Sequence, residues 1–102
     1  MKISYRNDKE KLFYEDFKAL KATYGKRMAE KIIDRIGDLV AATTPQHLPQ
    51  SASFHEHQGT RKGLYSLNLV HPFRLIVEPT CVYESYVHIT EVMIYEVFNP
   101  HK

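Results

Sequence analysis

Residues 65–77, YSLNLVHPFRLIV, alternate apolar and polar side chains on both sides of a His-Pro pair. Because side chains alternate between the two faces of a strand, each half predicts a β-strand with one buried face. A proline turn between two such runs predicts a β-hairpin. The side chains expected to point into the core are Tyr65, Leu67, Leu69, Phe73, Leu75 and Val77. Those expected on the opposite face are Ser66, Asn68 and Arg74.

A further strand is expected within residues 86–98, YVHITEVMIYEVF, which carry apolar side chains at both sets of alternate positions. A strand that is apolar on both faces is typical of the centre of a sheet. One face is expected to hold Val87, Ile89, Met93, Tyr95 and Val97, and the other Val92, Ile94 and Phe98.

The first half of the chain predicts helices after a short strand at residues 2–5. Asn7 is positioned to cap a helix that ends near Gly25. Its apolar stripe is expected to hold Phe13, Phe17 and Leu20.

Residues 26–42 follow the helical period more closely than any other stretch. The apolar face is expected to hold Ala29, Ile32, Ile33, Ile36, Leu39 and Val40. The solvent face is expected to hold Lys31, Asp34, Arg35 and Asp38. Pro45 disfavours further helix, so residues 43–53 are expected to form a surface connection.

This order of a strand, two helices and three or four strands predicts an α+β fold in a single domain of residues 1–102. Two helices are expected to cover one face of the sheet. The opposite face is then free for function, and Arg74 is expected to stand on it. A cross-strand ion pair with Glu91 or Glu96 is the alternative role for Arg74.

The composition is typical of a globular protein, with 43% hydrophobic residues, 25% charged residues and a net charge of +2. Residues 1–35 hold ten Lys or Arg against six Asp or Glu. Such an excess favours a phosphate backbone or an acidic partner, but it also fits a solvated helix face. No stretch suits a signal peptide or a membrane span, so a cytoplasmic location is expected. A single cysteine, Cys81, excludes an internal disulfide.

Basic and imidazole side chains gather just before the hairpin. Arg61 and Lys62 lie between two glycines, where they fit either a phosphate-binding loop or an ordinary charged turn. His55 and His57 have the spacing of a metal pair, but further ligands are not specified by the pattern. Proton transfer near neutral pH suits these histidines better, although a surface role is also open.

Two stretches, FHEHQGTRKGLYSLNLVHPFRLIVEP at 54–79 and ITEVMIYEVFNPHK at 89–102, resemble the HigB toxins of the RelE/ParE superfamily. The resemblance implies a RelE-like fold, with two helices on a curved, mainly antiparallel sheet. It also implies the toxin of a type II toxin–antitoxin system, a ribosome-dependent endoribonuclease that cleaves mRNA. The implied partners are the ribosome, mRNA and a HigA-like helix-turn-helix antitoxin, through which operator DNA is bound.

The resemblance also assigns roles to individual residues, without a metal or a cofactor. It implies metal-independent acid–base catalysis by His55, Arg74 and His101, with the ribose 2′-OH attacking the adjacent phosphate. It implies RNA contacts by Arg61, Lys62, His57 and Asn99.

The chain departs from the HigB pattern in two places. His57-Gln58-Gly59 stands where many members have Leu-Lys-Gly, and Asn99-Pro100-His101 stands where many end in Asp-Tyr-His. Asn99 cannot take a proton as a carboxylate does, and Pro100 cannot stack on a base as tyrosine does. A ParE-like gyrase inhibitor, or a catalytically weakened antitoxin-binding module, is therefore the alternative function.

Overall fold

The computed structural model describes residues 1–59 and 62–100, which form three α-helices, five β-strands and three short 3₁₀ turns. The helices are α1 (Asp8–Tyr14), α2 (Phe17–Tyr24) and α3 (Lys26–Ala41). The strands are β1 (Lys2–Tyr5), β2 (His55–Glu56), β3 (Tyr65–Asn68), β4 (Arg74–Pro79) and β5 (Glu91–Phe98). The 3₁₀ turns are Pro45–His47, Gln50–Ala52 and Tyr86–His88.

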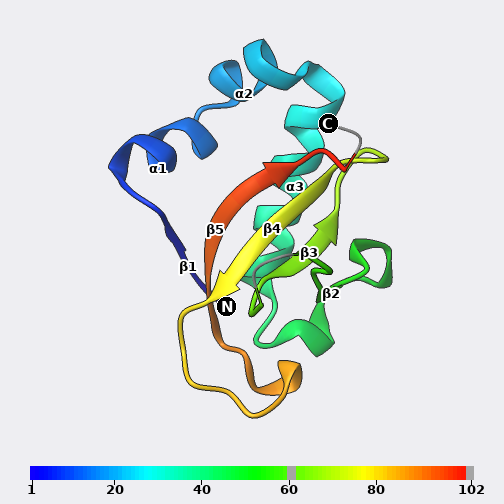
Figure 1. Cartoon of the computed structure of the whole chain (residues 1–102). Helices are drawn as coiled ribbons and strands as arrows, with labels where there is room; N and C mark the ends of the chain where they lie inside the picture. The colour runs from blue at the N-terminus through cyan, green and yellow to red at the C-terminus, as the bar shows by residue number, and fades with distance from the viewer. Residues whose placement is uncertain (60–61, 101–102) are drawn as a thin grey trace.

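The five strands form one mixed sheet in the order β1-β5-β4-β3-β2 (Figure 1). β1 runs parallel to β5, and the other neighbouring strands are antiparallel. The expected hairpin is confirmed as β3 and β4, with Asn68 opposite Arg74 next to the turn. The expected central strand is also confirmed, because β5 lies between β1 and β4. The chain therefore has the α+β fold that its sequence predicts.

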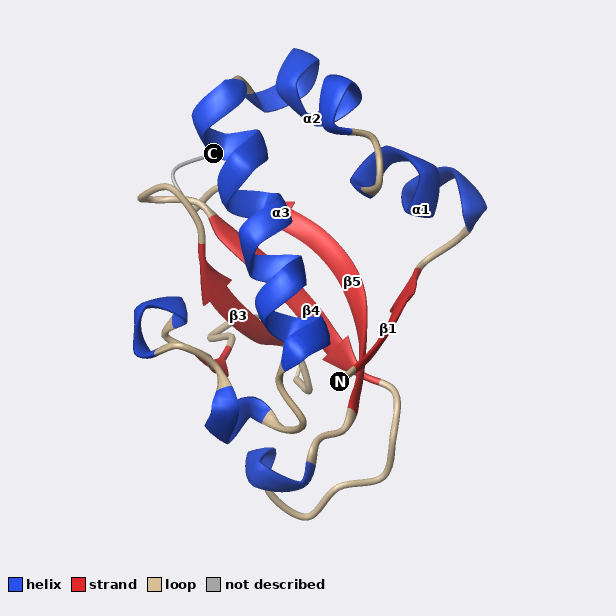
Figure 2. Cartoon of the chain, turned by 180° about the vertical axis from the view of Figure 1, so that it is seen from behind, coloured by secondary structure: helices blue, strands red, loops and turns tan. Residues whose placement is uncertain are grey.

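One helix covers the sheet, rather than the two that the sequence predicts. α3 lies across one face, and α1 and α2 lie around the end of the sheet where β5 finishes (Figure 2). They contribute the buried Tyr14 and Leu20 to the core, and Phe13 and Tyr24 pack against it.

The predicted helix from Asn7 to Gly25 is interrupted after Tyr14. Asn7 does cap α1, because its side chain accepts a hydrogen bond from the backbone N–H of Glu10 at 2.8 Å. Asp16 then caps α2 by accepting from the N–H of Ala19 at 3.2 Å. A second cap inside the predicted helix starts a new helix.

The hydrophobic core lies between α3 and the sheet. All six side chains that the hairpin pattern assigned to the core belong to it or pack against it. From α3 the buried apolar residues are Met28, Ala29, Ile32 and Leu39. Ile33 and Val40, which were expected on the buried face, are 39% and 59% exposed.

Arg35 was expected on the solvent face of α3, but it is buried, with a relative exposure of 6%. Its guanidinium donates to the carbonyl oxygens of Asn68 at 2.7 Å and Ser51 at 3.1 Å. It also pairs with Asp38 at 3.1 Å. Arg35 is buried because carbonyl groups from two other segments and one carboxylate satisfy its charge.

A β-bulge in β5 changes which of its residues share a face. Ile76 of β4 lies opposite Glu96, but the next residue, Val77, lies opposite Ile94. Tyr95 is therefore the extra residue, and the alternation shifts there by one position. Val92, Ile94 and Val97 contribute to the core. The simple alternation expected for this strand is therefore wrong beyond Ile94.

Candidate active site

The sheet face turned away from α3 carries most of the predicted site, and we call it the site face. Two neighbouring rows of paired residues cross it. One row consists of Asn68, Arg74 and Phe98, and the other of His55, Ser66, Ile76 and Glu96. Ser66 and Ile76 are each about 1% exposed, because residues after β2 fold back over this face. The site face is thus partly covered and not a bare sheet.

His55 is held by hydrogen bonds at both ring nitrogens. Its Nδ1 lies 2.6 Å from the carbonyl oxygen of Ser53, to which it must donate a proton. In the neutral ring, Nε2 then accepts from the Ser66 hydroxyl at 3.2 Å. The Ser53 carbonyl is turned toward the ring from a left-handed backbone conformation, with φ of 50°. His55 therefore has a fixed tautomer and orientation in its neutral form.

His57 lies one residue beyond β2 and faces the sheet. Its backbone N–H donates to Leu64 at 2.8 Å, which closes the loop between β2 and β3. Its ring packs edge-on against Phe98, with ring centroids 4.9 Å apart and an interplanar angle of 76°. Within the described residues, neither ring nitrogen of His57 has a hydrogen-bond partner. Among the described residues, the imidazole is therefore positioned by packing against Phe98.

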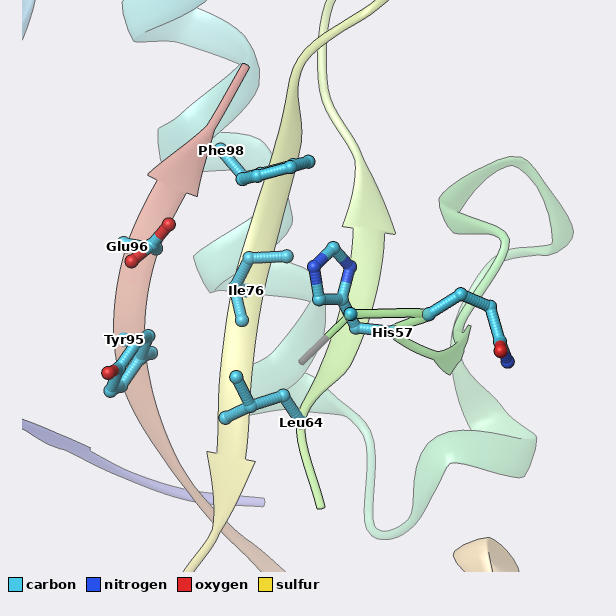
Figure 3. Close-up of a pocket in the computed structure, with 8 residues that line it drawn as sticks. His57, Leu64, Ile76, Tyr95, Glu96 and Phe98 are labelled. Carbon is cyan, nitrogen blue, oxygen red and sulfur yellow. The ribbon is translucent and has the colours of Figure 1, made fainter. Parts of the chain in front are cut away.

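A pocket of about 390 Å³ opens between the His57 loop and the last strand. Figure 3 shows the His57 ring pointing toward Ile76 and Phe98, with Tyr95 and Glu96 on the far side. The lining residues are His57, Gln58, Gly59, Leu64, Ile76, Tyr95, Glu96 and Phe98. The bulge explains why Tyr95 and Glu96, which are consecutive, both reach the same pocket.

Glu96 is the acidic group of this pocket. Among the described residues, its carboxylate accepts no hydrogen bond and forms no ion pair. The guanidinium of Arg6 lies 4.8 Å from the centroid of the Tyr95 ring, and its Nη1 donates to the Tyr95 carbonyl at 3.4 Å. Arg6 thus stabilises the bulged strand. Glu96 lines the pocket, and its charge adds to the burial that raises the pKa of Tyr14 and Tyr24.

Arg74 stands on the site face as the sequence predicts. Its Nη1 donates to the carbonyl oxygens of Pro72 and Phe73, both at 3.2 Å. Within the part of the chain that the structure describes, these bonds to the hairpin turn leave Nη2 and Nε for other acceptors. The alternative of a cross-strand ion pair is not realised, because Glu91 pairs with Lys2 at 3.7 Å and Glu96 pairs with nothing described.

The remaining predicted residues are only partly described. Lys62 is exposed in the loop before β3, next to Gly63, whose φ of 85° suits glycine. Asn99 is half-buried just after β5. Arg61 and His101 lie outside the described residues.

Apart from His57, the sequence pattern predicts no site role for the lining residues of the pocket. It offers Glu96 only as an ion-pair partner for Arg74, and it gives Tyr95 a place in a simple alternation. A charged residue inside an apolar strand was the available signal for Glu96. The sequence pattern does not reveal the bulge that brings Tyr95 and Glu96 to the same pocket.

Tyr65 lies on the core side of the same hairpin and has a strongly perturbed phenol. Burial, followed by a hydrogen bond with Tyr83, raises the pKa of Tyr65 to about 12. Its ring also stacks on Phe54 at 5.0 Å. This aromatic contact anchors the segment that leads into β2.

Other site types receive no support from the described residues. Among residues 1–59 and 62–100, no group of three or more His, Cys, Asp or Glu side chains is placed to hold a metal ion. No helix in the same residues is both long and apolar enough to cross a membrane. In comparisons with known proteins, no family model matches the chain and no curated protein is significantly similar to it.

Proposed function

We propose that this protein is a HigB-type toxin of the RelE/ParE superfamily that cleaves mRNA on the ribosome. The proposal joins the sequence resemblance to the geometry of the site face. Its reaction is an attack of the ribose 2′-OH on the adjacent phosphate, with expulsion of the 5′ oxygen. This reaction needs a cationic group at the phosphate and groups that move two protons.

The convergence of Arg74 and His57 on Phe98 carries this proposal. Phe98 lies opposite Arg74 across β4 and β5, and its ring contacts the His57 ring at 4.9 Å. Two residues from distant parts of the sequence thus meet at Phe98, Arg74 as its partner on the neighbouring strand and His57 through its ring. A guanidinium with free donors suits the charge that develops on the phosphorane, and an imidazole suits proton transfer at cellular pH.

The proposed roles follow from which nitrogen atoms of Arg74, His55 and His57 already form hydrogen bonds within the described residues. Arg74 binds the non-bridging phosphate oxygens through Nη2 and Nε. His57 is assigned a proton-transfer role in preference to His55, because both ring nitrogens of His55 are already engaged. His55 holds the β2 segment in position and exchanges a proton only after its bond to Ser66 opens. His101 keeps the second proton-transfer role that the resemblance implies.

RNA would reach this site over the loop that carries Arg61 and Lys62. Cations next to a glycine suit a phosphate backbone, and their contribution to binding would fall steeply with salt. Asn99 would add a hydrogen bond at the end of β5. No cofactor enters this reaction.

The HigA-like antitoxin is proposed to bind the helical side of the molecule. Exposed apolar side chains lie there, with Phe17 at 36%, Ile33 at 39% and Val40 at 59% exposure. The first third of the chain also carries the basic excess. Apolar side chains among charged ones are typical of a protein interface.

Primer extension on a defined mRNA, with and without ribosomes, tests the proposed activity. The expected result is cleavage that requires ribosomes, persists in EDTA and leaves a 2′,3′-cyclic phosphate and a 5′-OH. A protein that leaves mRNA intact on ribosomes but inhibits DNA gyrase would support the ParE-like alternative. The Asn99-Pro100 departure is the observation that favours this alternative.

A further inference from the structure

The pocket on the site face contains chemistry that phosphate-backbone cleavage does not use. Three of its lining side chains are flat rings, from His57, Tyr95 and Phe98. Its floor is apolar, with Leu64 and the buried Ile76. Rings beside an apolar floor suit a flat, partly apolar ligand that stacks.

The charge of the pocket decides which part of a nucleotide enters it. Glu96 places a carboxylate among the lining residues, and within residues 1–59 and 62–100 no Lys or Arg lines the pocket. A phosphate would be repelled by this carboxylate and would lose its water without a compensating cation. Arg74, one row away across the sheet, offers that cation outside the pocket. The phosphate therefore belongs at Arg74, and the base belongs in the pocket.

A lone carboxylate also selects among the bases. It presents two hydrogen-bond acceptors and no donor. On its Watson–Crick edge, guanine offers two adjacent donors, N1–H and N2–H. Adenine and cytosine each place a ring-nitrogen acceptor beside their amino group, and uracil flanks its single N–H with two carbonyls. Only guanine can satisfy both oxygens of one carboxylate without an opposing acceptor.

We propose that this pocket binds a guanine base of single-stranded RNA and that Glu96 is the residue that selects it. The inference rests on the proposed function for RNA as the source of the base. Glu96 accepts from N1–H and N2–H, and the Gln58 amide at the same pocket donates to O6. Phe98 and His57 provide the stacking surfaces. The bulge at Tyr95 is what turns Glu96 into the pocket beside the rings.

Nuclear magnetic resonance titration of the whole chain with guanosine and adenosine 5′-monophosphates tests this inference without any cleavage. The wild-type protein is expected to bind the guanine nucleotide at least about tenfold more tightly, with the largest shifts at His57, Tyr95 and Phe98. A glutamine offers one acceptor and one donor, which matches the edge of adenine. Glu96→Gln is therefore expected to reverse the preference.

A reversal of preference cannot result from loss of folding, so this variant reports on recognition itself. Glu91→Gln, which makes the same change on the same strand outside the pocket, is the matched control and is expected to keep the guanine preference. Equal affinities for both nucleotides, binding without shifts in the pocket, or an unchanged preference in Glu96→Gln would overturn the inference. Guanine binding without ribosome-dependent cleavage would instead overturn only the proposed function.

Discussion

His57 and Phe98 meet edge to face, although 40 residues separate them in the chain, with ring centroids 4.9 Å apart. The contact joins the loop after β2 to the end of β5 across the site face. It brings an imidazole with no described hydrogen-bond partner beside the strand position opposite Arg74. The site residues are therefore brought together by β5, the last strand in the chain.

This contact predicts that His57 matters more for cleavage than His55. His57→Gln is expected to lower the single-turnover rate on ribosome-bound mRNA by about 10² or more, because it removes the proposed proton-transfer group. His55→Gln is expected to cause a smaller loss. His88→Gln, an exposed histidine in a 3₁₀ turn, is the control and should cleave normally.

A larger loss of rate in His55→Gln than in His57→Gln would show that His55 leaves its hydrogen bonds and acts as the proton-transfer group. A variant at Ser66 separates these cases. Ser66→Ala removes the partner of His55 Nε2, and under our assignment it should resemble His55→Gln in rate.

Arg35 is predicted to hold the connection before β2 in place. Arg35→Met removes a charge that binds Ser51, Asn68 and Asp38, so two carbonyl oxygens and a carboxylate lose their donor. The expected cost is roughly 3 kcal/mol of unfolding free energy, measured by urea denaturation. Arg27→Met on the exposed side of α3 is the control and should change stability by less than about 0.5 kcal/mol. Similar losses in both variants would refute this role.

Alkaline pH is predicted to destabilise the fold through Tyr65. Its pKa rises from an ordinary value of 10.0 to about 12 in the folded chain. The folded state thus retains the phenol proton more strongly than the unfolded state does. This contribution to stability is complete below pH 10 and is lost as pH rises toward 12.

Urea unfolding at several pH values from about 9 to about 12 measures this effect. Tyr65→Phe should make the decline in stability shallower than in the wild type. It should not abolish the decline, because burial also raises the pKa of Tyr14. Tyr86→Phe removes an exposed phenol and should leave the wild-type slope. An unchanged slope in Tyr65→Phe would contradict the prediction.

The sequence predicted the hairpin and α3 well, because local periodicity determines both. The prediction from periodicity was wrong where a single residue interrupts a regular strand or helix. The bulge at Tyr95 shifts the alternation of an otherwise regular apolar strand, and such a strand looks the same with or without it. Asp16 was a readable cap, but the stripe through Phe17 favoured one continuous helix. In the structure Phe17 is 36% exposed.

The candidate site was predicted in part for the same reason. Alternation along β4 placed Arg74 on the correct face. The buried state of Arg35 could not be read from its helix, because its partners come from residues 51 and 68. The pocket combines a loop and a bulged strand, so its residues share no sequence pattern.

Arg74→Ala provides the most direct test of the central claim that the site face cleaves RNA. The measurement is the single-turnover rate of cleavage of ribosome-bound mRNA, together with the melting temperature of each protein. Loss of the phosphate-binding guanidinium is expected to reduce the rate by about 10² to 10³. The melting temperature should stay close to that of the wild type, because among the described residues Arg74 bonds only to turn carbonyls, and its loss leaves no apolar cavity. Arg27→Ala is the control for loss of a surface charge. Wild-type cleavage by Arg74→Ala, or a melting temperature that falls in step with the rate, would contradict the claim.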